Sequence, residues 1–255
     1  MMPRLDDCRF RFRSAIVTWS GGIDSTALLA CLVSQSPTIT ALSFDMPYGP
    51  LFNKREADAR EALWPTMMRH AVIAGCNLER THRDASFLPS FENAPGHSDP
   101  TAAAGAIPMR NRLMIDYLCA RWPQRYCIGM GEYVGADSWV TKDHVTGLDC
   151  DSRALTAYLF ENYGLSKQLV TLDHFGPCRF KDQRLKIGLD VIEDAMMLTT
   201  NCLNDNELHC GECYKCCERA AAFEAACDTD ATKYATMPDR AMVERYKAQF
   251  SQGIE

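Results

Sequence analysis

Two short segments of the chain carry residue types and spacings that are suited to chemistry. The first is SGGIDS, residues 20–25, which follows the stretch SAIVTW and leads into an apolar run. Gly21 and Gly22 let the backbone approach an anion closely, while Ser20 and Ser25 add hydroxyl donors. Because a helix that follows such a turn also presents partial positive charge, the segment predicts a phosphate site.

The acidic residue of this segment, Asp24, predicts a divalent cation. Its carboxylate would repel bound phosphates unless a cation lay between them, and Mg²⁺ is the cation whose oxygen chemistry suits that place. The segment matches neither GxxxxGK[ST] nor GxGxxG, so neither a Walker site nor a dinucleotide fold is indicated. The alternative is a tight turn in which the serine and aspartate side chains only cap the helix.

The second segment is a cluster of five cysteines within residues 202–217, out of thirteen in the chain. Four of them have the spacing C-x7-C-x2-C-x2-C, which suits a tetrahedral zinc site: Cys202, Cys210, Cys213 and Cys216. An iron–sulfur cluster is the competing interpretation, but a ferredoxin run would place a fourth cysteine where Ala220 stands. Cys217 is expected to be a bystander, although it could substitute for Cys216.

Other cysteines and histidines have simpler expected roles. Cys31, Cys119 and Cys127 lie in apolar surroundings and are expected to be small core residues. His209 precedes Cys210 and could replace a zinc ligand, but four cysteines suffice, so an exposed histidine is the expected explanation. His144 lies in a polar, irregular stretch that suits a binding loop.

Composition limits the classes of protein that the chain can represent. The formal charge of −6 over 255 residues and the pI near 5.6 argue against general binding of nucleic acid through an electrostatic field. No apolar run approaches the roughly 20 residues of a membrane helix. The beginning MMPRLDDCRFRFR lacks the apolar segment of a signal peptide, so we expect a cytoplasmic protein without membrane contact.

Hydrophobic patterning predicts alternating strands and helices. Strands are expected at 14–19, 39–44 and 125–130, and helices at 24–34, 53–74 and 109–122. This succession predicts right-handed βαβ units, and therefore an α/β fold: a doubly wound, Rossmann-like parallel sheet with helices on both faces. The stretches 93–105 and 138–151 are expected to be loops.

The first segment, SGGIDS, resembles the SGGxDS loop of the N-type ATP pyrophosphatases, the PP-loop superfamily. That superfamily has an adenine nucleotide alpha hydrolase-like fold and splits ATP into AMP and pyrophosphate. Its members adenylate a carbonyl oxygen, and a nitrogen or sulfur nucleophile then displaces AMP. The resemblance implies that ATP and its pyrophosphate contact six residues: Ser20, Gly21, Gly22, Asp24, Ser25 and Thr26.

The second segment narrows the resemblance. CGECYKCCERAAAF, residues 210–223, resembles the zinc segment CGxCxxCxxRxxxF of 7-cyano-7-deazaguanine synthases, which act in queuosine biosynthesis, and Cys202 stands where that family has its first zinc cysteine. Three further stretches resemble family motifs in the same order: PMRN resembles PARN, GLDC resembles YPDC, and FKDQRL resembles TKxEI. The resemblance implies a PP-loop domain at 12–200 and a small helical extension at 201–255 that binds zinc through four cysteines.

By this resemblance the substrate is 7-carboxy-7-deazaguanine, a 7-deazapurine acid that ATP, Mg²⁺ and ammonia convert to an amide and then to the nitrile. Lys181 and Asp24 are the implied catalytic residues at the phosphates, and Arg110 is implied to hold the acid or a phosphate. The implied substrate contacts are Arg110, Asn111, His144 and Asp149. The alternative for Arg110 and Lys181 is a solvated surface charge. The family also implies a homodimer.

Two stretches depart from the family and leave other functions open. FDMPYGPLFNKREAD lacks the Gln-Arg-His of YGQRHxxE, and DCDSRAL has Asp151 and Arg153 where arginine and glutamate are expected. A diverged member could stop at the amide or transfer its acyl group to another amine, for example in a phage-defence system. The acidic net charge disfavours a tRNA-modifying PP-loop enzyme. The intact SGGIDS segment disfavours a zinc-stabilised adaptor that has lost catalysis.

Overall fold

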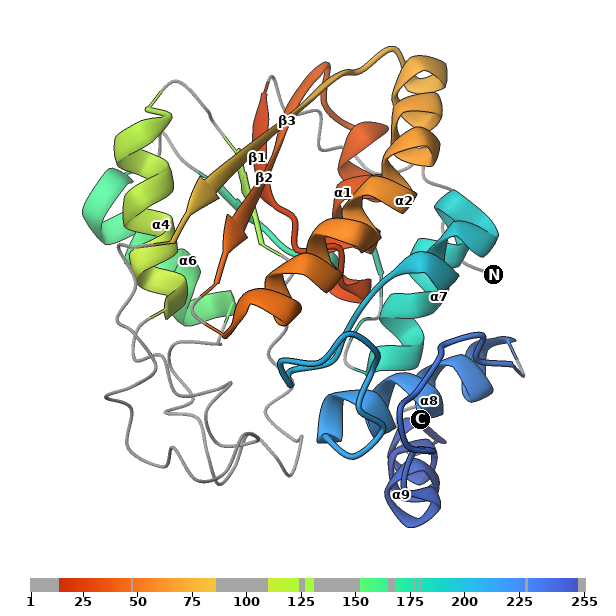
Figure 1. Ribbon diagram of the computed structural model, residues 1–255. Helices are drawn as coiled ribbons and strands as arrows, with labels where there is room; N and C mark the ends of the chain where they lie inside the picture. The colour runs from red at the N-terminus through yellow and green to blue at the C-terminus, as the bar shows by residue number, and fades with distance from the viewer. Residues whose placement is uncertain are drawn as a thin grey trace.

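A five-stranded parallel sheet forms the centre of the computed structural model (Figure 1), in the order β3-β2-β1-β4-β5. The structure describes residues 14–46, 48–85, 110–123, 127–130, 152–164, 168–176, 178, 180–227 and 229–251. The strands are β1 (Ala15–Thr18), β2 (Thr38–Asp45), β3 (Asn77–Asp84), β4 (Cys127–Gly129) and β5 (Gln168–Val170). The α/β fold with a parallel sheet is therefore confirmed.

Helices cover both faces of this sheet. On one face lie α1 (Ile23–Val33), α2 (Pro50–Ala74) and α7 (Lys181–Ile192), and on the other α4 (Arg110–Arg121) and α6 (Ser152–Tyr163). Alternate residues of β2 serve the two layers, because Ala41 belongs to the apolar cluster of α1 while Leu42 and Phe44 belong to that of α4 and α6. The central strands β1 and β4 are consequently buried along nearly their whole length, as expected of a sheet covered on both faces.

The C-terminal part of the chain is helical and packs beside α7 (Figure 1). It contains α8 (Tyr214–Cys227) and α9 (Arg240–Ser251), and the turns η4 (Leu172–His174) and η5 (Glu193–Leu198) precede it. Phe223 of α8 and Phe250 of α9 are buried in the same apolar cluster as Leu28 and Leu185. The extension thus shares its core with α1 and α7, and the division at residue 200 stays a prediction.

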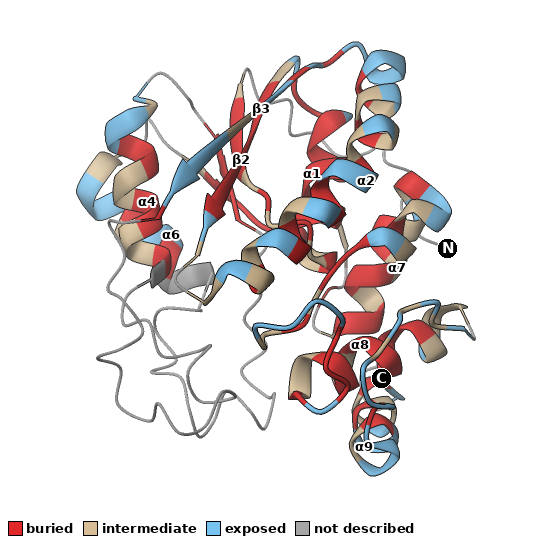
Figure 2. Cartoon of the chain, in the orientation of Figure 1, coloured by how far each residue is buried: buried red, intermediate tan, exposed pale blue. Residues whose placement is uncertain are grey.

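Most predicted elements lie within a few residues of their observed bounds, but several observed elements, α6 and α7 among them, were not predicted. α2 begins at Pro50 rather than 53, because Gly49, with φ +121°, ends the preceding turn and proline is suited to the first helical position. β3 was not expected, since its sequence NLERTHRD is mostly exposed along the sheet edge (Figure 2). β5 was not expected either; it has only three residues.

The cysteines outside the cluster agree with the sequence analysis. Cys31, Cys119 and Cys127 are buried in the core, and burial raises the pKa of the Cys127 thiol to about 12. Every cysteine in the described part of the chain is a free thiol. Among the described helices, none combines the length and the apolar character that crossing a bilayer requires.

The topology places the SGGIDS segment at a characteristic ligand position. β1 pairs with β2 on one side and with β4 on the other, and the strand order reverses there. Ligands of open parallel sheets bind outside the carboxyl ends of the strands at such a point. The segment that follows β1 therefore has the right location for a phosphate site.

Candidate functional site

The SGGIDS turn is held by its own hydroxyl groups. The Gly22 amide donates to Ser20 Oγ at 3.1 Å, and the Ser20 amide donates to Ser25 Oγ at 3.2 Å. The N-cap of α1 is Gly22, and no side chain caps this helix. The interpretation of the serine and aspartate side chains as mere helix caps is therefore wrong; the serines fix the turn that precedes the helix.

Three amides in the first turn of α1 lack an acceptor within the described residues. The helical ladder begins with the Thr26 amide, which donates to the Gly22 carbonyl at 3.0 Å. Among the residues that the structure describes, the amides of Ile23, Asp24 and Ser25 have no hydrogen-bond acceptor. Unpaired amides at a helix N-terminus, behind a glycine turn, are the usual elements of a phosphate site.

Both glycines of the turn are fitted closely to their neighbours. Gly21 has φ +87°, and a Cβ there would lie 3.2 Å from Arg60 Cγ and from the Glu56 carbonyl oxygen. The Gly21 carbonyl accepts from the Thr200 amide at 2.9 Å. At Gly22 a Cβ would approach the Thr200 carbonyl oxygen to 3.2 Å. A side chain at either position would therefore strain the turn and disturb its contact with residue 200.

Asp24 is surrounded by positive charge. Its Oδ2 accepts from Lys181 Nζ at 2.5 Å, and its Oδ1 lies 3.3 Å from Arg184 Nη1. Burial opposes ionisation of Asp24, but the charges of Lys181 and Arg184 outweigh it and hold the pKa of the carboxyl well below its usual range. The structure thus brings two predicted catalytic residues, Asp24 and Lys181, into direct contact at the start of α1.

Lys181 is an internal residue of the site. Its side chain is 0% exposed, so the alternative of a solvated surface charge is wrong for this residue. Glu218 of α8 lies 3.9 Å from Lys181 Nζ and 3.3 Å from Lys215 Nζ. Sequence reasoning missed Arg184, Lys215 and Glu218. The available signal was their spacing: Lys181 and Arg184 are three residues apart on α7, and Lys215 and Glu218 are three residues apart on α8. Residues at this spacing lie on the same face of a helix.

The other predicted site residues are less well defined. Thr26 is fully buried, and its Oγ1 accepts a hydrogen bond from Trp19 Nε1 at 3.1 Å, so its side chain joins the two ends of the turn. Asn111 is also fully buried, in the first turn of α4. Arg110 begins that helix, and His144 and Asp149 lie outside the described residues. Roles of these residues in substrate binding stay predictions.

The four predicted metal ligands converge in the C-terminal part. Their sulfur atoms all lie within 4.8 Å of one another: Cys202, Cys210, Cys213 and Cys216. Cys210 and Cys216 Sγ are 3.8 Å apart, and Cys213 and Cys202 Sγ are 4.0 Å apart. Zinc–sulfur bonds of about 2.3 Å in a tetrahedron place sulfur atoms about 3.8 Å apart. The donor set therefore fits a four-thiolate zinc site.

Hydrogen bonds among the thiol groups of this centre shift their pKa values in opposite directions. Hydrogen bonds from Cys213 and Cys216 lower the pKa of Cys202, whereas the hydrogen bond with Cys202 raises the pKa of Cys213 to about 12. The Cys210 amide also donates to Cys202 Sγ at 3.4 Å. Four ionised sulfur atoms at this separation require a compensating cation, which is the chemistry that a divalent metal supplies.

His209 lies beside this centre, and the expectation of an exposed histidine is wrong. The residue is buried; its Nε2 lies 3.2 Å from Thr200 Oγ1 and its Nδ1 4.0 Å from Cys216 Sγ. Burial lowers the pKa of His209 to about 3, so the ring is neutral. Cys217 Sγ donates to the Gly211 carbonyl at 3.6 Å, away from the four ligands, as expected of a bystander.

The phosphate turn and the cysteine centre are physically joined. Thr200, which pairs with the turn at Gly22, is two residues from Cys202. Arg55 of α2 binds both, because its guanidinium donates to Thr200 Oγ1 at 3.3 Å and to the Cys202 carbonyl at 2.8 Å. Arg55 is itself 8% exposed. One buried side chain therefore fixes the distance between the two centres.

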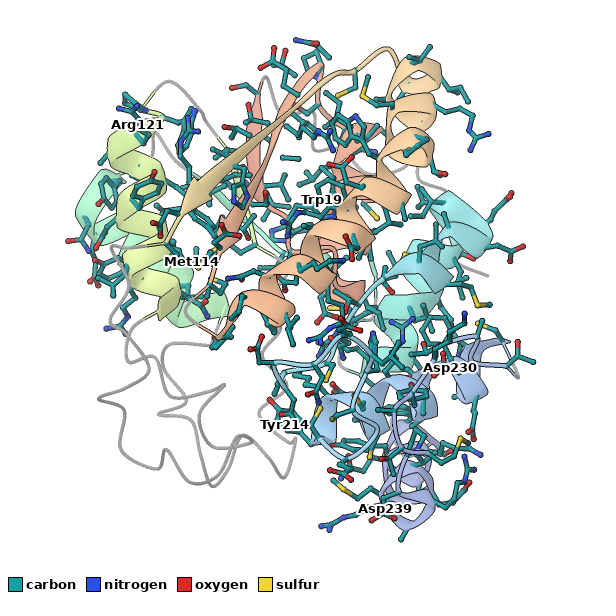
Figure 3. The ribbon with its side chains drawn as sticks, in the orientation of Figure 1. Trp19, Met114, Arg121, Tyr214, Asp230 and Asp239 are labelled. Carbon is teal, nitrogen blue, oxygen red and sulfur yellow. The ribbon has the colours of Figure 1, made fainter. Side chains whose placement is uncertain are left out.

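A cavity of about 380 Å³ lies between α2 and the strands β2 and β3. Trp19, labelled in Figure 3, and Arg60 line it and also border the phosphate turn, where Arg60 Nη1 donates to the Ser20 carbonyl at 3.2 Å. Asp24 and Lys181 do not line this cavity. The cavity therefore adjoins the phosphate turn but does not include these two charged residues.

Together, the sheet, the turn with free helix amides and the nearby four-cysteine centre define an α/β nucleotide-binding protein of the PP-loop kind. Comparison with known proteins agrees. The family model "Queuosine biosynthesis protein QueC" matches residues 14–227. Since that match spans most of the sequence, the chain belongs to the QueC family, whose members are ATP-dependent enzymes.

Curated relatives support the same assignment. The 7-cyano-7-deazaguanine synthase of Marinomonas sp. (strain MWYL1) is 27% identical over 228 residues, which cover 86% of this chain and 97% of that protein. The synthase of Brucella anthropi is 26% identical, and the match covers 86% of this chain and 92% of that protein. The synthase of Psychromonas ingrahamii is 28% identical, and the match covers 84% of this chain and 94% of that protein. The chain thus spans nearly the whole length of these relatives.

Proposed function

We propose that the chain adenylates the carboxylate of 7-carboxy-7-deazaguanine, or of a related acid, and with ammonia forms first the amide and then the nitrile. The observation that carries this proposal is the contact between Asp24 and Lys181 beside the unpaired amides of Asp24 and Ser25. This arrangement suits the β- and γ-phosphates of ATP, because it combines a helix N-terminus with a buried cation. It leaves the α-phosphorus open to attack.

The proposed reaction proceeds by two activations. A carboxylate oxygen attacks the α-phosphorus of ATP, the bond to the β-phosphate oxygen breaks, and pyrophosphate leaves. Ammonia then attacks the acyl carbon, AMP leaves with the carboxylate oxygen, and the amide remains after loss of a proton. A second ATP adenylates the amide oxygen, and a second pyrophosphate leaves. Departure of AMP and two protons from this intermediate gives the nitrile, so the remaining carboxylate oxygen also ends on AMP.

The charged residues of the site divide these tasks. The Lys181 ammonium would move from Asp24 toward the leaving pyrophosphate, whose negative charge grows in the transition state. Asp24 would hold Mg²⁺, which when bound neutralises phosphate charge and orients the leaving group. The acid would be bound by Arg110 and Asn111, together with His144 and Asp149 from the stretch after β4. The four cysteines would bind Zn²⁺ as a structural site, because four thiolates leave no open position for chemistry.

The direct test of this proposal is product analysis. The chain is incubated with ATP, Mg²⁺, ammonium and 7-carboxy-7-deazaguanine, and products are identified by mass spectrometry. We expect 7-cyano-7-deazaguanine together with AMP and pyrophosphate. Amide without nitrile would restrict the proposal to the first activation, and the absence of AMP with every acid tested would refute it. Sedimentation of the same sample tests the homodimer that the family resemblance implies.

A further inference from the structure

The phosphate site contains more charged groups than the proposed chemistry uses. Three cations, Lys181, Arg184 and Lys215, surround two carboxylates, Asp24 and Glu218. If Mg²⁺ takes Asp24, Glu218 is the carboxylate that remains near Lys181 and Lys215. One carboxylate balances only one of these two positive charges, so the cluster is suited to receiving further negative charge.

Lys215 is the most accessible cation of the three. The exposed fraction of its side chain is 27%, against 10% for Arg184 and 0% for Lys181. Its ammonium pairs with Glu218 at 3.3 Å, over one turn of α8, and lies 5.2 Å from the centre of the Tyr214 ring. It therefore has room to exchange one anionic partner for another.

The cysteine centre fixes the position of Lys215. The residue stands between Cys213 and Cys216, at the start of α8, which the label of Tyr214 marks in Figure 3. Its carbonyl accepts from Asn201 Nδ2 at 3.2 Å, and Asn201 follows the residue that pairs with Gly22. The backbone of Lys215 is thus anchored both to the cysteine centre and to the phosphate turn.

We propose that Lys215 is a further anion-binding residue of the phosphate site. In the free protein Glu218 pairs with the Lys215 ammonium, and a bound phosphate replaces this carboxylate. This inference rests on the proposed function and adds a residue to it. Glu218 stabilises the protein without ligand, since it neutralises Lys215 and approaches Lys181 to 3.9 Å. The same carboxylate competes with the ligand, so it lowers the affinity for phosphate.

The experiment measures the affinity for magnesium pyrophosphate by isothermal titration calorimetry, together with the zinc content and the melting temperature. We expect Lys215→Met to weaken binding about tenfold, because a charge-assisted hydrogen bond is lost. Glu218→Gln should change affinity in the opposite direction, with binding about threefold tighter and a lower melting temperature of the free protein. Lys186→Met, at a partly exposed residue of α7 that pairs with Asp182, is the matched control and should bind like the parent chain.

Opposite effects of the two variants distinguish ligand binding from a structural role, which would weaken binding in both. Restoration of affinity by Lys215→Arg would support the proposal further. Equal affinity of Lys215→Met and the parent chain would overturn the inference and leave the proposed function intact. If the parent chain itself fails to bind magnesium pyrophosphate, the proposed function fails, and the inference fails with it.

Discussion

Asp24→Asn should reduce the release of AMP and pyrophosphate by about a thousandfold, the loss typical when a main electrostatic element of an active site is removed. Asparagine keeps the size of the side chain but cannot neutralise a cation. The substitution removes the negative charge that faces both the proposed Mg²⁺ and, at 2.5 Å, the Lys181 ammonium. The measurement is the steady-state rate of pyrophosphate release at saturating ATP.

A matched substitution separates this effect from loss of charge in general. Asp58 is exposed on α2 and pairs with the exposed Lys54 at 2.6 Å, so Asp58→Asn should leave the rate unchanged. The melting temperature of Asp24→Asn reports whether the protein still folds, since Lys181 retains Glu218 at 3.9 Å. A folded Asp24→Asn variant with the rate of the parent chain would contradict the role given to this carboxylate.

Cys216→Ser should cause the largest loss of stability. It removes one ligand of the four-cysteine centre, and we expect the variant to lose its zinc and about 3 kcal/mol or more of unfolding free energy. For a chain of this size that corresponds to a melting temperature about 10 °C lower. Because Thr200 and Arg55 join the centre to the phosphate turn, activity should fall as well. Zinc is measured by atomic emission and stability by calorimetry.

The neighbouring cysteine supplies the control. Cys217→Ser places a hydroxyl where the thiol donates to the Gly211 carbonyl, so it should retain zinc and lose about 1 kcal/mol at most. If Cys217→Ser lost the metal and Cys216→Ser kept it, Cys217 would be the fourth ligand in place of Cys216.

The local parts of the site could be predicted from the sequence because they depend on short-range patterns. Paired glycines after a strand favour the turn that Gly21 and Gly22 form, and the cysteine spacing predicted that four sulfur atoms would come together. Apolar runs predicted β1, β2 and α1 for the same reason. β3 escaped prediction because an edge strand that is largely exposed carries no apolar pattern.

The long-range contacts of the site could not be derived from local sequence patterns. Arg55 and Thr200 are separated by 145 residues, and Lys181 and Asp24 by 157. No spacing rule connects positions so far apart; Lys181 was placed at the phosphates by the family resemblance alone, and its contact with Asp24 depends on the packing of α7 against α1. Burial of His209 had the same origin, since its neighbour Tyr234 comes from a later segment.

The most direct test of the account follows the backbone amides during addition of magnesium pyrophosphate to the isotopically labelled chain. If the helix N-terminus grips the phosphates, the amide resonances of Asp24 and Ser25 will shift most and will saturate together with the calorimetric binding curve. Saturable shifts confined to residues around the cavity, such as Ser43 and His82, with those two amides unmoved, would contradict the account.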